Sequence, residues 1–97
     1  MPAYSIETLN GLLEELLDLP ARTSPAADVN AALRVADRLE SDGYVFSLKD
    51  LCPRSMDSLW RASFRLGDRE FSAEDARSAP AICAAAVAAL RERPGKS

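Results

Sequence analysis

Hydrophobic positions are most concentrated near the end of the chain, where the twelve residues from Ala79 to Leu90 include no charged or strongly polar side chain. Alanine dominates this run and is the best helix former, and Pro80 fits only in the first turn. A helix that is apolar all round is normally covered on more than one side. Twelve residues span about 18 Å, which is too short to cross a bilayer. The run therefore predicts a helix that is buried in the core or covered by a partner.

The two sides of this predicted helix differ in size. The larger side chains form a stripe that we expect to pack on Trp60, Phe64 and Leu66. The other side consists of alanines, and it is open to three interpretations: bare surface, a subunit interface, or contact with the second helix, which we favour. The stripe is Ala79, Ile82, Cys83, Ala86, Val87 and Leu90, and the alanine side is Ala81, Ala84, Ala85, Ala88 and Ala89.

Two further helices are predicted in the first half of the chain by apolar residues at 3.6-residue spacing. The first spans residues 5–18, with Ser5 as its N-cap and Pro20 beyond its end. The second starts with Ser24 as N-cap and Pro25 in the first turn, and Gly43 ends it in a left-handed conformation. Their apolar stripes are Ile6, Leu9, Leu13, Leu16 and Leu17 in the first helix, and Val29, Ala32, Leu33, Ala36 and Leu39 in the second.

Three strands are predicted between the second and the last helix. Residues 44–48 form the first strand, and a long turn follows over residues 49–58. Residues 60–66 show the clearest alternation in the chain, with Trp60, Ala62, Phe64 and Leu66 on one face. Gly67 and Asp68 make a tight turn into a short third strand over residues 69–73, which places Phe71 on the core side. Residues 74–78 lead into the last helix.

This order predicts an α+β fold, in which a three-stranded antiparallel meander packs with three helices in a layered, sandwich-like arrangement of order α-α-β-β-β-α. The whole chain, residues 1–97, is long enough for one small domain. Its core is expected over residues 24–91, and residues 92–97 are expected to form a frayed polar tail.

The sequence also resembles the phage ABA sandwich domain family, small proteins of bacteriophages and prophages with helices packed on a short antiparallel sheet. Three patterns carry the resemblance over residues 24–90: the second helix running into a strand, Trp60-Arg-Ala-Ser-Phe, and Ala79-Pro-Ala-Ile-Cys. The resemblance implies a three-layer sandwich and a phage or prophage setting, and it brings no catalytic residue with it.

Charge and cysteine content narrow the function classes. The formal net charge is −3, which disfavours a general nucleic-acid or anionic-membrane binder. Residues 1–48 carry eight acids and three arginines, whereas residues 49–97 carry nine basic and seven acidic residues. This asymmetry fits either an ordinary solvated surface or charge pairing between subunits. With two cysteines and no recognisable leader, we expect a cytoplasmic protein of a bacterial host.

Little in the sequence points to catalysis. The chain contains no histidine, so the commonest general base and metal ligand is missing. Cys52 and Cys83 are too far apart in sequence to suggest a zinc site, and Cys83 is interpreted as a buried apolar residue. Cys52 lies near Lys49 and Arg54, where some thiolate character is conceivable. We therefore expect no enzyme activity, no cofactor and no metal.

A row of arginines is the most specific polar feature. Arg61, Ser63 and Arg65 share the face of their strand opposite Trp60, and Lys49 or Arg54 extends the row. Guanidinium groups suit bidentate contact with phosphate or carboxylate. Alternatively, these charges simply keep the sheet face solvated. Solvent-facing arginines on one sheet face are at odds with a three-layer sandwich. An open sheet face or a subunit interface at this position would reconcile the two.

Two functions follow as hypotheses. The first is a small non-enzymatic phage or prophage accessory protein that binds a host or phage protein, or a second copy of itself. The alternative is a binder of an anionic, phosphorylated ligand through the row of Arg61, Ser63, Arg65, Lys49 and Arg54. Neither hypothesis involves a membrane, and nucleic acid is not the expected partner.

Overall fold

The computed structural model describes residues 5–17, 28–51 and 58–91. The predicted order of two helices, three strands and a final helix is confirmed, and with it the α+β fold class. The elements are α1 (Ile6–Leu17), α2 (Val29–Ser41), β1 (Val45–Asp50), β2 (Trp60–Leu66), β3 (Arg69–Asp75) and α3 (Ser78–Arg91).

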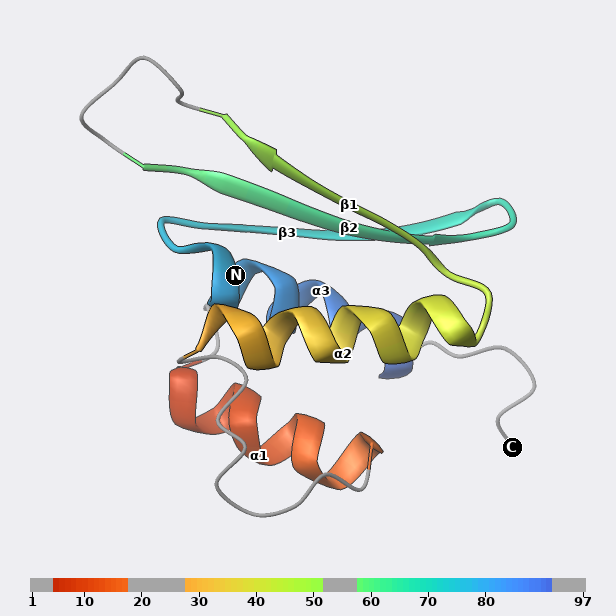
Figure 1. The fold of residues 1–97 in the computed structure, drawn as a ribbon, viewed down its shortest axis with the longest axis horizontal. Helices are drawn as coiled ribbons and strands as arrows, with labels where there is room; N and C mark the ends of the chain where they lie inside the picture. Colours follow the sequence, from red (N-terminus) through yellow and green to blue (C-terminus); the bar gives the residue numbers. More distant parts are fainter. Residues whose placement is uncertain (1–4, 18–27, 52–57, 92–97) are drawn as a thin grey trace.

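The described elements stack in three layers (Figure 1). The strands form one antiparallel sheet in the order β1-β2-β3. Beneath the sheet, α3 packs on β2 and β3, while α2 packs on β1 and on the side of α3. The third layer is α1, which packs on α3 away from the sheet. The three described helices therefore lie on one face of the sheet, and no described element covers its other face.

Both N-terminal helices begin with a side chain that satisfies a free backbone amide. The Ser5 hydroxyl accepts from the Thr8 N–H at 3.1 Å, which confirms Ser5 as the N-cap of α1. In α2 the N-cap is Asp28, whose carboxylate accepts from the Asn30 N–H at 2.9 Å. The prediction of Ser24 as the N-cap was wrong, because Asp28 is extended and starts the helix four residues later. Ser24 itself lies outside the described residues.

The turn from α2 into β1 follows the prediction. Gly43 adopts a φ of 102°, a conformation that other residues rarely accept. The Tyr44 N–H donates to the Leu39 carbonyl and the Gly43 N–H to that of Glu40, which together make a Schellman motif. This motif turns the chain from the helix layer up to the sheet.

The outer strands are longer than predicted. Lys49 and Asp50 belong to β1 and not to a turn, and Glu74 and Asp75 belong to β3. Both ends are charged, so they carry no hydrophobic alternation from which a strand could be recognised. They extend because β2 offers backbone partners as far as Trp60, which pairs with Asp50 on one side and Asp75 on the other.

The apolar helix α3 is covered within the chain. Ala81, Ala85 and Ala89 of its alanine side are fully buried, and Ala84 and Ala88 are half-buried. The predicted contact with α2 is confirmed at the level of the two helices, and α1 also packs on α3. The sequence did not predict this second contact. The apolar surface of α3 is thus buried inside the fold, and no second subunit is needed to cover it.

Replacing Ala85 by Leu tests how closely the surrounding elements pack on α3. We expect the free energy of unfolding to fall by about 1–3 kcal/mol, because a fully buried position in a packed core has no room for three more carbons. The same replacement at half-buried Ala88 leaves part of the leucine in water and should cost less. Urea unfolding followed by circular dichroism measures both variants. Equal losses would contradict close packing at Ala85.

Candidate functional site

The open face of the sheet gathers four of the five residues predicted to form a binding surface. The strand register places Lys49 of β1 beside Arg61 of β2, and Ser63 and Arg65 follow on the same face. Arg54, the fifth residue, lies outside the described residues. Across the sheet the face has three rows: Val45–Arg65–Glu70, Ser47–Ser63–Ser72 and Lys49–Arg61–Glu74. We call this the open sheet face.

Arg61 is already paired with a carboxylate. Its Nε and Nη2 both donate to Oε2 of Glu74 on the neighbouring strand, the first at 2.8 Å and the second at 2.5 Å. Both side chains are exposed. An incoming anion would have to compete with this carboxylate for the guanidinium. Sequence reasoning missed Glu74 because it placed the residue after the third strand and not within it.

Ser63 differs from the prediction as well. It was expected to face solvent, yet only 8% of its surface is exposed. It sits on the central strand, and its neighbours in the register are Ser47 on β1 and Ser72 on β3. A short side chain in the middle of a sheet is covered by what surrounds it. The arginine row is therefore interrupted by a buried serine.

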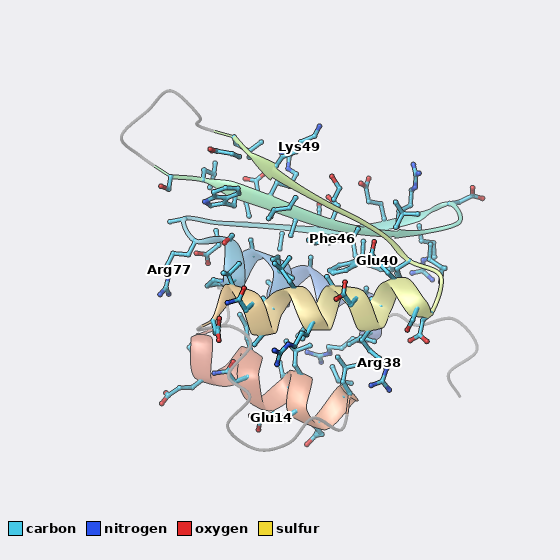
Figure 2. The ribbon with its side chains drawn as sticks, in the orientation of Figure 1. Glu14, Arg38, Glu40, Phe46, Lys49 and Arg77 are labelled. Carbon is cyan, nitrogen blue, oxygen red and sulfur yellow. The ribbon has the colours of Figure 1, made fainter. Side chains whose placement is uncertain are left out.

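The remaining cations, Lys49 and Arg65, are exposed and form no ion pair with any described residue. Figure 2 shows Lys49 on the side of β1 away from the helices. The register sets Arg65 beside Glu70, just as it sets Arg61 beside Glu74. Cations thus lie on β1 and β2 while acids lie on β3, so the face is not a uniformly basic surface.

A second surface of interest was not predicted. Val29 and Leu33 were assigned to the apolar stripe of α2, yet they are 40% and 39% exposed, whereas Ala31 and Val35 are buried. The buried stripe of α2 is thus rotated relative to the prediction. On β1, the exposed fraction of Val45 reaches 55%, and Phe46 and Leu48 are half-buried.

The two exposed apolar residues of α2 share one side of the helix. Val29 and Leu33 lie one turn apart, and Glu40 falls on the same side of the helix three turns after Val29. Figure 2 places Glu40 and Phe46 where α2 meets β1. By this spacing Val29 and Leu33 lie on the side of α2 that carries Glu40, while Phe46 and Leu48 lie on the inner face of β1, the edge strand that α2 contacts. We call these four residues the α2–β1 ledge.

Cys83 lies on α3 in the core and is no candidate nucleophile. Burial removes water from the thiol and raises its pKa from 9.0 to about 12. At neutral pH it is a neutral, apolar side chain, as the sequence analysis expected. Cys52, the other cysteine, lies outside the described residues.

No match was found when the chain was compared with family models, with curated proteins and with solved structures. Among the described residues there is no group of three or more His, Cys, Asp or Glu side chains placed to hold a metal ion. None of the described helices has the length and apolar character needed to cross a bilayer.

Replacing Glu74 by Gln tests how much the Arg61 pair contributes to stability. We expect the free energy of unfolding to fall by less than about 1 kcal/mol, because exposed ion pairs are weakened by water and by salt. Glu70→Gln is the matched control, since Glu70 lies on the same strand and forms no ion pair with a described residue. Urea unfolding at low and high salt measures the difference. A larger loss, insensitive to salt, would show that the open sheet face is structural.

The burial of Cys83 predicts slow thiol chemistry. In a Cys52→Ser variant, we expect the remaining thiol to react with an aromatic disulfide reagent at pH 8 only as fast as the protein unfolds. Because the folded-state pKa is raised, the unfolded chain loses its thiol proton first as the pH rises. The free energy of unfolding should therefore fall from about pH 9 towards pH 12. Complete reaction without denaturant, as fast as in urea, would contradict this burial.

Proposed function

We propose that this protein is a small accessory protein that acts by binding another protein and not by catalysis. The observation that carries the proposal is the α2–β1 ledge. Valine and leucine side chains on a helix of a small fold are normally turned inwards, yet Val29 and Leu33 leave about two fifths of their surface exposed. Exposed apolar side chains that lie together on one surface are typical of protein-interaction sites.

The chemistry of the described residues supports a binding role. The chain has no histidine, the Cys83 thiol is buried, and Arg61 is neutralised by Glu74. Acid–base or nucleophilic catalysis requires a group with a pKa near the working pH and access to substrate. Burial keeps the Cys83 thiol from such access, and the Arg61 guanidinium is already bonded to Glu74.

The setting of the proposed function comes from the resemblance to the phage ABA sandwich domain family. On that basis we propose that the protein belongs to a phage or prophage and acts in the cytoplasm of a bacterial host on a host or phage protein. Self-association belongs to the same class of function. Since α3 is covered within one chain, its apolar surface no longer argues for a dimer, and any subunit contact must use another surface.

Anion binding by the arginine row has less support. Arg61 donates to Glu74, Ser63 is buried, and Glu70 stands beside Arg65. A phosphorylated ligand would meet two acidic side chains on the same face. The apolar ledge has no comparable internal competitor.

Photo-crosslinking tests the protein-binding function. A photoreactive phenylalanine analogue is placed at Leu33 of the ledge, and the matched control carries it at Leu16 of α1, which has the same exposed fraction of 39%. We expect irradiation of bacterial cells that make the protein to give a defined protein adduct from position 33 and none from position 16. Mass spectrometry then identifies the captured chain.

The captured protein must also bind in isolation. When purified, it should bind the Leu16→Glu variant as it binds the unmodified chain and lose at least about tenfold in affinity for Leu33→Glu, because a carboxylate cannot be buried without a partner. Adducts that are the same from both positions, or a captured protein that ignores Leu33→Glu, would overturn the proposed function.

A further inference from the structure

The residues of β1 are of two kinds, those whose backbone groups bond to β2 and those whose backbone groups point to the free edge of the sheet. The Leu51 N–H donates to the Leu59 carbonyl at 2.8 Å, just beyond the end of the strand. These two residues continue the register of the β1–β2 pair. In an antiparallel pair, hydrogen-bonded positions alternate with positions whose N–H and C=O groups point away. Counting back from Leu51, the backbone groups of the odd-numbered residues of β1 bond to β2. The backbone N–H and C=O groups of the even-numbered residues point away from β2, in the plane of the sheet.

Phe46 and Leu48 are the two residues in the middle of β1 whose backbone groups point away from β2. Their N–H and C=O groups point to the side of β1 opposite β2, where no described strand pairs with them. Their side chains lie on the inner face and are only half-buried. A strand added at this edge would satisfy the four backbone groups and cover the two side chains at once.

The helix layer extends beneath this edge. Packed helices lie about 8–10 Å apart, whereas neighbouring strands lie about 4.8 Å apart. Since α3 packs on both β2 and β3, α2 must lie at or beyond β1, which is the strand it contacts. The side of α2 that carries Val29 and Leu33 is therefore left without a described strand above it. This explains why two aliphatic residues near the core are 40% and 39% exposed.

The opposite edge of the sheet is protected. Four of the seven residues of β3 are charged, namely Arg69, Glu70, Glu74 and Asp75. Charged edge strands discourage pairing with another chain. On β1 the charges are confined to Lys49 and Asp50 at its end, and the exposed Val45 lies at its start. The two edges are therefore unequal, and β1 is the one suited to strand addition.

We propose that an extended segment of the partner docks as a fourth strand beside β1 and packs on α2 with its inner face. This proposal rests on the proposed function, because it states how the protein partner binds. The partner segment has apolar residues at alternate positions, which pack on Val29, Leu33, Phe46 and Leu48. On the outer face it has an acidic residue beside Lys49, whose ammonium group has no ion pair with a described residue.

A second folded copy of this chain does not fit the same position through its own β1. Antiparallel pairing of the two β1 edges would place both α2 helices on the same side of the joined sheet. With strands about 4.8 Å apart and each α2 at or beyond its own β1, the two helices would overlap. The occupant is therefore a strand without a helix beneath it, such as an extended arm or terminal segment.

A peptide with the sequence of residues 44–50, capped at both ends, is the probe. It carries Phe46 and Leu48 on one face and no helix beneath them. We expect saturable binding with a Kd of about 10 µM to 1 mM, and slower amide exchange at Phe46 and Leu48 of the protein by at least about fivefold. The amides of Ser47 and Lys49, already bonded to β2, should change less. Nuclear magnetic resonance of the ¹⁵N-labelled protein measures both quantities.

Three controls sharpen the test. A scrambled peptide that puts the Phe and Leu on opposite faces should bind at least about tenfold more weakly. Leu33→Glu in the protein should weaken binding by a similar factor, and Leu16→Glu should not. A probe peptide with its own Val45→Glu, which places a carboxylate opposite Lys49 when Phe46 pairs with Leu48, should bind more tightly at low salt.

The outcomes separate this inference from the proposed function. Absence of binding at about 1 mM, equal binding of the scrambled peptide, or protection away from Phe46 and Leu48 would each overturn strand docking. If the peptide fails while position 33 still captures a protein that Leu33→Glu releases, strand docking falls and the protein-binding function stands. If neither experiment succeeds, both are wrong.

Discussion

The burial of α3 is the constraint on which the rest of the structure depends. Ten of its fourteen residues are buried, and its small alanines allow other helices to come close. A helix without a polar face cannot lie at the surface of a small domain, so it needs cover on all sides. The sheet provides that cover on one side, and α1 and α2 provide it on the other. Every described helix is consequently drawn to the same face of the sheet.

Two surfaces arise from this arrangement. With every described helix on one side, the other face of the sheet is free of described elements, and its rows of serine, arginine and glutamate suit contact with water. With two helices beneath three strands, the helix layer is wider than the sheet, so the α2–β1 ledge remains partly uncovered. The first surface is polar and internally paired, and the second is apolar and incomplete. We therefore interpret the polar surface as a solvated face and the apolar surface as a docking site, on the basis of their chemistry and not of their size.

The open sheet face shows why like residues in one strand do not make an anion site. Arg61 and Arg65 share a face, but the antiparallel register sets Glu74 and Glu70 beside them on β3. The ion pair between Arg61 and Glu74 neutralises the charge that an anion would seek. The sequence of one strand gives only the charges of its own side chains. The net charge around them also depends on the side chains of the neighbouring strands.

The sequence by itself determined the element order, the alternation of β2, the Ser5 cap of α1 and the turn at Gly43, because each depends on local spacing or on one residue's backbone preference. It also showed that α3 had to be covered. Tertiary structure alone decided that α1 shares this cover, that Glu74 reaches Arg61, that Ser63 is buried, and that Val29 and Leu33 remain exposed. These features depend on which elements become neighbours and on how wide each layer is. Neither relation is encoded in the periodicity of any single segment.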